Sequence, residues 1–254
     1  MIAIFKREFK AYFTSPVGHI FLAFMFFFLG LTFYISYSSG SADIPSVTGG
    51  VYVYLLFLVP IITMRLLSEE RHNKVDQILL TAPVSLWGII SGKFLAAFAV
   101  YCIGFAPTII FEIIASNLVE VNVGAYLYML FGVLLFGAVL IALGLFISSL
   151  TESTSVAAIA TIIVNLLIML MPNIVAIIDS TSTSITGISI KWISDTILWL
   201  KDGLVFILDK LSLAEPINQF YLQIITLGDM VYYLSFIAAF LFLSVRSLEK
   251  RRWS

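Results

Sequence analysis

The chain has 254 residues, of which 61% are hydrophobic and only 11% are charged, and its mean hydropathy is +1.06. These values exclude an ordinary soluble domain, because a water-facing surface needs more polar residues than this sequence supplies. The formal net charge of −1 gives no long-range field of one sign, so we expect no nucleic-acid partner. The composition predicts an all-α polytopic membrane protein, whose outer apolar surface faces the lipid bilayer.

Residues 1–16 predict an amphipathic helix that lies at the membrane interface. Its apolar side chains recur at helical spacing and are Ile2, Phe5, Phe9, Tyr12 and Phe13. The basic residues Lys6, Arg7 and Lys10 occupy the remaining arc, where they would contact anionic head groups. Pro16 is a suitable stop for this helix. The alternative is a basic N-terminus without regular structure.

Six apolar runs are each long enough to cross a hydrocarbon core of about 30 Å as a helix. They are residues 17–37, 51–67, 92–116, 126–150, 154–178 and 229–245. A cleaved signal peptide is the alternative for the first run, but this run exceeds the roughly 7–15 apolar residues of such a peptide. Residues 179–228 are more polar and predict amphipathic helices in an extracytoplasmic segment. The alternative is a further span at 193–208, which Asp195, Lys201 and Asp202 disfavour.

The distribution of lysine and arginine predicts the orientation. Six spans place both termini on one side, and the cations of the opposite side are then only Lys191, Lys201 and Lys210. Because cytoplasmic loops carry the excess of Lys and Arg, we expect both termini in the cytoplasm, with the protein in the bacterial inner membrane. Trp87 and Lys93 flank the third span and are expected to be interfacial anchors.

Several residues inside the spans are unusual for a lipid-facing helix. Pro60 predicts a kink whose freed carbonyl needs a partner from a neighbouring helix. Asn165 is expected to form an interhelical hydrogen bond. Glu112 is an ionisable residue within a span, and we expect it to lie close enough to the outer interface to reach water, the alternative being a functional site. Close helix approach is expected at the small residues Gly132, Gly137 and Gly144.

The sequence contains no phosphate-binding loop of the Gly-x-x-x-x-Gly-Lys-Ser/Thr type, no His-Glu-x-x-His helix and no Gly-x-Ser-x-Gly elbow. We therefore expect that this chain binds no nucleotide, metal or other cofactor and is not an enzyme. A membrane-embedded enzyme remains the least favoured alternative.

Residues 68–85 form the only charge-dense run between apolar segments. Glu70 and Lys74 stand four residues apart in the order that favours a helical ion pair. An apolar strip runs beside this pair and consists of Leu67, Val75, Ile78 and Leu79. Pro83 would stop such a helix. The pattern predicts a cytoplasmic helix that fits into a groove of a partner, and the alternative is an ordinary solvated loop.

Two stretches resemble the permease subunits of type-2 ABC transporters, most closely the gliding-motility-associated branch. They are residues 5–16, FKREFKAYFTSP, and residues 67–94, which include LSEER, VDQILLTAPVS and GKF. The resemblance implies that residues 68–85 are a coupling segment that docks on a separate ABC ATPase, which would bind ATP and Mg. It also implies a second permease half, so that two halves and two ATPases form the working unit.

This resemblance implies the permease subunit of an ATP-driven exporter, and the branch it is most similar to implies a role in gliding motility. The expected polar contacts to the ATPase are Glu69, Glu70, Arg71 and Lys74, and the expected buried contacts are Val75, Ile78 and Leu79. A non-transporting membrane anchor or assembly platform for envelope or motility machinery is the alternative, because anchoring also needs a docking helix.

Overall fold

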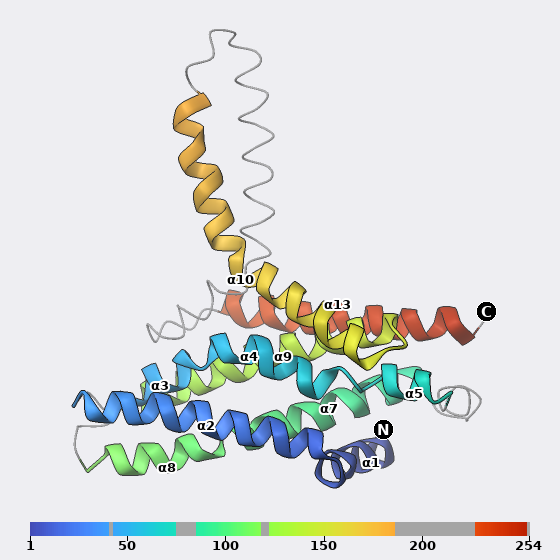
Figure 1. Ribbon diagram of the computed structural model, residues 1–254, viewed down its shortest axis with the longest axis horizontal. Helices are drawn as coiled ribbons and strands as arrows, with labels where there is room; N and C mark the ends of the chain where they lie inside the picture. Colours follow the sequence, from blue (N-terminus) through green and yellow to red (C-terminus); the bar gives the residue numbers. More distant parts are fainter. Residues whose placement is uncertain (41–42, 75–84, 118–121, 186–226, 253–254) are drawn as a thin grey trace.

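The computed structural model describes residues 1–40, 43–74, 85–117, 122–185 and 227–252 (Figure 1). Within these ranges the chain forms helices and no strand. The helices are α1 (Ile2–Thr14), α2 (Pro16–Ser38), α3 (Ile44–Gly50), α4 (Tyr52–Thr63), α5 (Ser68–His72), α7 (Leu86–Gly104), α8 (Ala106–Ala115), α9 (Val123–Leu150), α10 (Thr154–Ile185) and α13 (Leu227–Arg252).

Six of the described helical segments are long and apolar enough to cross a membrane. They are Pro16–Ser38, Tyr52–His72, Leu86–Ala115, Val123–Leu150, Thr154–Ile177 and Leu227–Lys250. The predicted all-α polytopic class is confirmed. The third segment starts at Leu86 rather than at residue 92, and it is interrupted at Phe105. Pro107 follows this interruption and has no N–H to continue the α-helical ladder.

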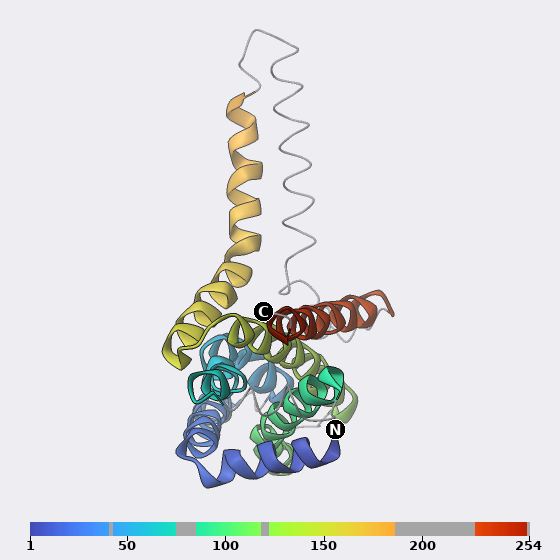
Figure 2. The same ribbon diagram turned by 90° about the vertical axis from the view of Figure 1, so that its right-hand side faces the viewer.

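The bundle has two distinct ends, and α9 lies in its interior. Helix α9 contacts α3, α4, α7, α10 and α13, which explains why it is largely buried. Both termini and α5 lie at one end of the bundle, whereas α3 and α8 lie at the other end (Figure 1). Helix α1 runs across the first end rather than along the bundle (Figure 2).

Helix α10 starts against the bundle and then bends away from it (Figures 1 and 2). Its first part contacts α4 and α9, and Ile168 and Met169 pack against the core. Pro172 follows these residues and removes the donor for the carbonyl of residue 168, a common cause of a helix bend. The helix continues to Ile185, past the predicted end of the span at residue 178. The rest of the expected outer segment, including the alternative span at 193–208, lies outside the described residues.

Close approach of α9 to its neighbours depends on two of its glycines, as the sequence predicted. A Cβ atom at Gly137 would collide with the ring of Tyr101 on α7, and one at Gly144 would collide with Thr63 on α4. The Tyr101 hydroxyl donates a 2.7 Å hydrogen bond to the Val133 carbonyl. The contacts therefore fix both α4 and α7 against α9.

Replacing Gly144 with valine is expected to lower the free energy of unfolding by about 1–3 kcal/mol, because the new side chain overpacks the α4–α9 contact. Unfolding in detergent, followed by heat or denaturant, measures the effect. Gly30→Val is the matched control, since a Cβ at Gly30 meets no atom within 4 Å. Equal stability of the two variants would contradict this account of α9 packing.

Candidate functional site

The site is built around a break in the second membrane-crossing segment. Helix α4 ends at Thr63, the chain turns, and α5 begins at Ser68. Pro60 lies in the last turn of α4 and cannot donate to the Leu56 carbonyl four residues earlier. Backbone groups freed inside a membrane need partners from the protein, because no bulk water is present there. Side chains from four other helices supply these partners.

Helices α10 and α1 each bond one carbonyl of α4. The Asn165 side chain of α10 donates to the Leu56 carbonyl at 2.9 Å, the group that Pro60 leaves free. The Tyr12 hydroxyl of α1 donates to the Ile62 carbonyl at 2.6 Å. One contact therefore meets two expectations. It is the interhelical hydrogen bond predicted for Asn165, and it supplies the partner predicted for the carbonyl that Pro60 leaves free.

Helix α9 holds the turn and the start of α5 through one hydroxyl. Ser148 Oγ accepts from the N–H groups of Leu67 and Ser68, both at 3.1 Å, and donates to the Met64 carbonyl at 3.1 Å. The hydroxyl of Ser68 also donates to the Met64 carbonyl. The first residues of α5 have no side-chain cap of their own, so Ser148 takes the place of an N-cap.

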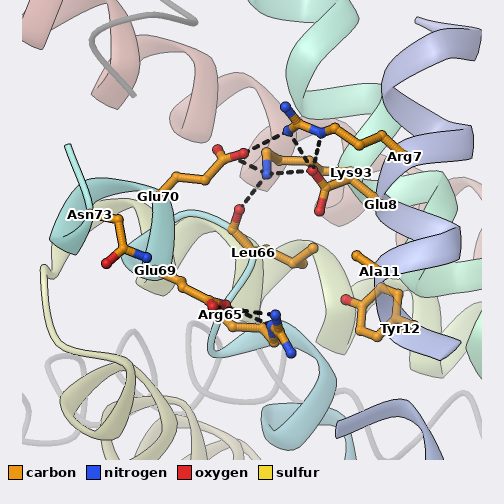
Figure 3. Close-up of a pocket in the computed structure, with 10 residues that line it drawn as sticks. All are labelled: Arg7, Glu8, Ala11, Tyr12, Arg65, Leu66, Glu69, Glu70, Asn73 and Lys93. Atoms are coloured by element: carbon orange, nitrogen blue, oxygen red, sulfur yellow. Dashed lines mark hydrogen bonds and ion pairs between the residues drawn. The ribbon is translucent and has the colours of Figure 1, made fainter. Parts of the chain in front are cut away.

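Helix α7 contributes Lys93, whose side chain is only 1% exposed (Figure 3). An ammonium group has three N–H donors, and here each has an acceptor. Lys93 Nζ lies 2.7 Å from the Leu66 carbonyl, 2.9 Å from Glu70 Oε2 and 3.2 Å from Glu8 Oε1. A buried charge is tolerated when it is paired and fully hydrogen-bonded, as Lys93 is.

Arg7 completes a neutral cluster of two cations and two carboxylates. Its guanidinium lies 2.6 Å from Glu8 and 2.7 Å from Glu70, so it bridges α1 and α5 (Figure 3). Burial alone would raise the pKa of Glu8, but the positive charges of Lys93 and Arg7 outweigh burial and hold that pKa below its ordinary value. We call Arg7, Glu8, Glu70 and Lys93 the charged cluster.

The lowered pKa of Glu8 predicts a loss of stability in acid. A carboxyl whose pKa is lower in the folded state stabilises the protein above its unfolded-state pKa, and this contribution disappears as the pH falls through the folded value. We expect Glu8→Gln to be less stable than the wild type at neutral pH, with the difference shrinking below the ordinary pKa of 4.5. Unfolding midpoints across this pH range test it. A difference that does not depend on pH would contradict the assignment, and Glu249→Gln at the exposed Arg246 pair is the control.

Two cavities flank the break. One of about 280 Å³ lies between α1 and the turn, where residues of the charged cluster line it (Figure 3). The other, of about 450 Å³, reaches the start of α10 and is lined by Glu152, Ser153 and Thr154. Arg65, Glu69 and Asn73 line both cavities, and Arg65 pairs with Glu69 at 2.7 Å. Helix α5 therefore has open space on two sides.

The structure corrects several expectations about residues 68–85. The expected ion pair between Glu70 and Lys74 is absent, because α5 ends at His72 and Lys74 has a φ of 57° in the following turn. The helix predicted within residues 68–85 is thus interrupted at Asn73 and Lys74. Glu70 instead joins the charged cluster, and Arg71 donates to the Leu150 carbonyl at 3.1 Å and pairs with Glu152 at 2.5 Å.

The other docking candidates differ in exposure. Glu69 is paired with Arg65, whereas His72, Asn73 and Lys74 are exposed. Three of the four polar candidates, Glu69, Glu70 and Arg71, therefore already contact other parts of this chain. The apolar candidates Val75, Ile78 and Leu79, and the stop at Pro83, lie outside the described residues.

The expected interfacial anchors fall into two groups. Lys6, Lys10 and Trp87 are exposed, as an anchor requires. Arg7 is also half-exposed but pairs with Glu8 and Glu70, whereas Lys93 is buried and has the same two carboxylates as partners.

The apolar face of α1 packs mainly against protein rather than lipid. Phe5 and Phe9 pack against the core, Tyr12 is buried, and Ile4 would meet a Cβ placed on Gly92. Gly92 thus allows α1 to approach α7. The interfacial helix predicted for residues 1–16 thus turns most of its apolar face to α7 and α2, and Ile2 and Phe13 stay exposed.

Glu112 lies at the other end of the bundle, on α8. We expected its carboxyl to reach water, but both of its oxygens are enclosed and neither has a hydrogen-bond partner. The residue as a whole is partly buried, and its carboxyl lies on the side of α8 that packs against the protein.

Sequence reasoning missed Glu8, Ser148 and the hydroxyl of Tyr12. Glu8 interrupts the basic arc of α1, which was a signal for a nearby cation. Ser148 carries no such signal, since a serine hydroxyl in an apolar helix commonly bonds its own backbone. Tyr12 carries none either, since its ring alone fits the apolar face of α1.

Six apolar helices in one chain define a multi-pass membrane protein. The chain belongs to the ABC-2 family of transporter proteins, because the sequence model of that family matches residues 2–253. It is therefore a permease component of an ABC transporter and not itself the ATPase, and family membership implies association with an ABC ATPase. No curated protein matches the chain.

Proposed function

We propose that this permease belongs to an ATP-driven exporter in the bacterial inner membrane, with both termini in the cytoplasm. Two permease halves would assemble with two ATPase subunits, which bind ATP and Mg. A role in gliding motility rests on the resemblance of residues 5–16 and 67–94 to that branch of permeases. Hydrolysis in the ATPases would then drive substrate movement between the permease halves.

The observation that carries the proposal is the break between α4 and α5. It lies at the bundle end that holds both termini, and this end collects most of the lysines and arginines of the described residues (Figure 1). The excess of cations supports a cytoplasmic location for this end. An ATPase docked there would meet the exposed His72, Asn73 and Lys74.

The contacts around the break indicate which helices would move together when an ATPase displaces α5. Ser148 ties α5 to α9, and Lys93 ties the turn and α5 to α7. Arg7 and Glu8 bring α1 into the same unit, and Asn165 connects α4 to α10. When the ATPases close, displacement of α5 would therefore move several helices together, and the two cavities leave room for it.

Co-purification and reconstitution test this proposal. The permease is expressed with its candidate ABC ATPase, and association, ATPase stimulation and permease unfolding are measured for Asn73→Trp and Lys74→Glu. We expect both variants to lose association and stimulation while the unfolding temperature stays unchanged, because these side chains are exposed. Asn117→Trp, exposed beyond α8 at the other end, is the matched control.

Unchanged association and stimulation in both variants would overturn the docking site. Association of the wild-type proteins without stimulation of ATP hydrolysis would instead favour a membrane anchor.

A further inference from the structure

Glu112 belongs to the inward-facing strip of α8, far from the α4–α5 break; the residue is half-buried, and both of its carboxyl oxygens are enclosed. The strip contains Thr108, Glu112 and Ala115, which are spaced by about one helical turn, and Thr108 and Ala115 are fully buried. The opposite face of α8 is exposed and wholly apolar, with Ile109, Ile110, Ile113 and Ile114. Glu112 thus shares its side of the helix with the residues that face α3 and α9.

The two hydroxyl groups beside Glu112 already donate their protons in other hydrogen bonds. The Thr108 hydroxyl donates to the Phe105 carbonyl at 2.7 Å, so in its 2.9 Å contact with the Tyr126 hydroxyl the tyrosine is the donor. Tyr126 of α9 is buried and electrostatically close to Glu112. Neither hydroxyl therefore has a proton left to donate to a Glu112 carboxylate, and both oxygens of Glu112 are without a hydrogen-bond partner.

The charges around Glu112 also oppose ionisation. Its charged neighbour is Asp43, at the start of α3, which has the same sign and accepts from Ser46. Within the described part of the chain, no lysine, arginine or histidine pairs with Glu112. Thr48 of α3 has a buried hydroxyl without a partner, but a hydroxyl carries no countercharge. A buried carboxylate without a cation is far less stable than the neutral acid.

We propose that Glu112 is a proton-binding site whose side chain is the neutral acid at neutral pH. It lies at the end of the bundle opposite the charged cluster. Loss of this proton would place two negative charges between α8 and α3 and weaken their contact. The site would therefore let the proton concentration on that side of the membrane bias the packing of these helices. It stands independently of where the ATPase docks.

Carbodiimide labelling of the full-length protein in lipid nanodiscs tests the proposal. Dicyclohexylcarbodiimide is apolar and reacts with protonated carboxyl groups, and mass spectrometry locates the adduct. At neutral pH we expect labelling of Glu112, loss of that adduct in Glu112→Gln, and retention of it in Asp43→Asn. A water-soluble carbodiimide with an added amine should modify the exposed Glu152 but not Glu112.

A second measurement keeps the test independent of reagent access. The infrared C=O stretch of a protonated carboxyl is expected in the wild type and absent in Glu112→Gln, whose unfolding temperature should stay unchanged because an amide resembles the neutral acid. The proposal is overturned if Glu112 reacts with the water-soluble reagent as readily as Glu152 does. Identical infrared spectra of wild type and Glu112→Gln would overturn it as well.

Discussion

Lys93→Met is expected to lower the free energy of unfolding by about 3–5 kcal/mol, the usual effect of removing one partner from a buried ion pair. The substitution keeps the length and apolar stem of the side chain but leaves Glu8, Glu70 and the Leu66 carbonyl without the ammonium group. Unfolding of the purified protein in detergent measures the loss. Lys10→Met on the exposed face of α1 is the matched control and should be close to neutral.

Removing the carboxylate charges that Lys93→Met leaves without their ammonium partner should restore much of this stability. In the triple variant Lys93→Met, Glu8→Gln and Glu70→Gln, the two amides replace carboxylates that would otherwise lie without a full set of cations. Neutral replacement of buried ion pairs is often tolerated, and the Arg7 charge that remains is half-exposed to water. A triple variant no more stable than Lys93→Met would show that Lys93 acts through packing and not through charge.

Ser148→Ala is also expected to have a large effect. It leaves the N–H groups of Leu67 and Ser68 without a partner, at a cost of about 1–3 kcal/mol for each. The Met64 carbonyl keeps the Ser68 hydroxyl, so the loss falls on the start of α5. Reduced stability and reduced stimulation of the ATPase by the reconstituted permease are the expected results.

Ser244→Ala is the control for this substitution. Ser244 is also fully buried, but its hydroxyl donates to the Phe240 carbonyl of its own helix, α13, and not to α5. Ser148→Ala is expected to impair ATPase stimulation much more than Ser244→Ala does. Equal effects of the two variants on stimulation would contradict a role of Ser148 in holding α5.

The membrane-crossing helices were predictable because hydropathy and length act locally along the chain. Pro60 and Asn165 could also be interpreted from sequence, since a proline frees a carbonyl and an amide within a span needs a partner. That Asn165 donates to the Leu56 carbonyl, the group Pro60 leaves free, could be seen only in the structure, because Leu56 and Asn165 are 109 positions apart.

The role of Lys93 could not be predicted from local pattern. A lysine near the end of an apolar run normally extends toward the head groups, and Glu8 lies 85 positions away. The expected pairing of Glu70 with Lys74 failed for a related reason. A helical ion pair contributes only about 0.2–0.5 kcal/mol, whereas leaving the buried Lys93 without a carboxylate partner such as Glu70 would cost about 3–5 kcal/mol.

The central claim is that nucleotide binding by the ATPase acts on the break between α4 and α5. Hydrogen exchange of residues 67–73 in the reconstituted complex tests it most directly, because Ser148 holds the N–H groups of Leu67 and Ser68. The account predicts that a non-hydrolysable ATP analogue changes the exchange of this segment relative to the nucleotide-free complex. Unchanged exchange there, while the ATPase subunits close and other segments of the permease respond, would contradict it.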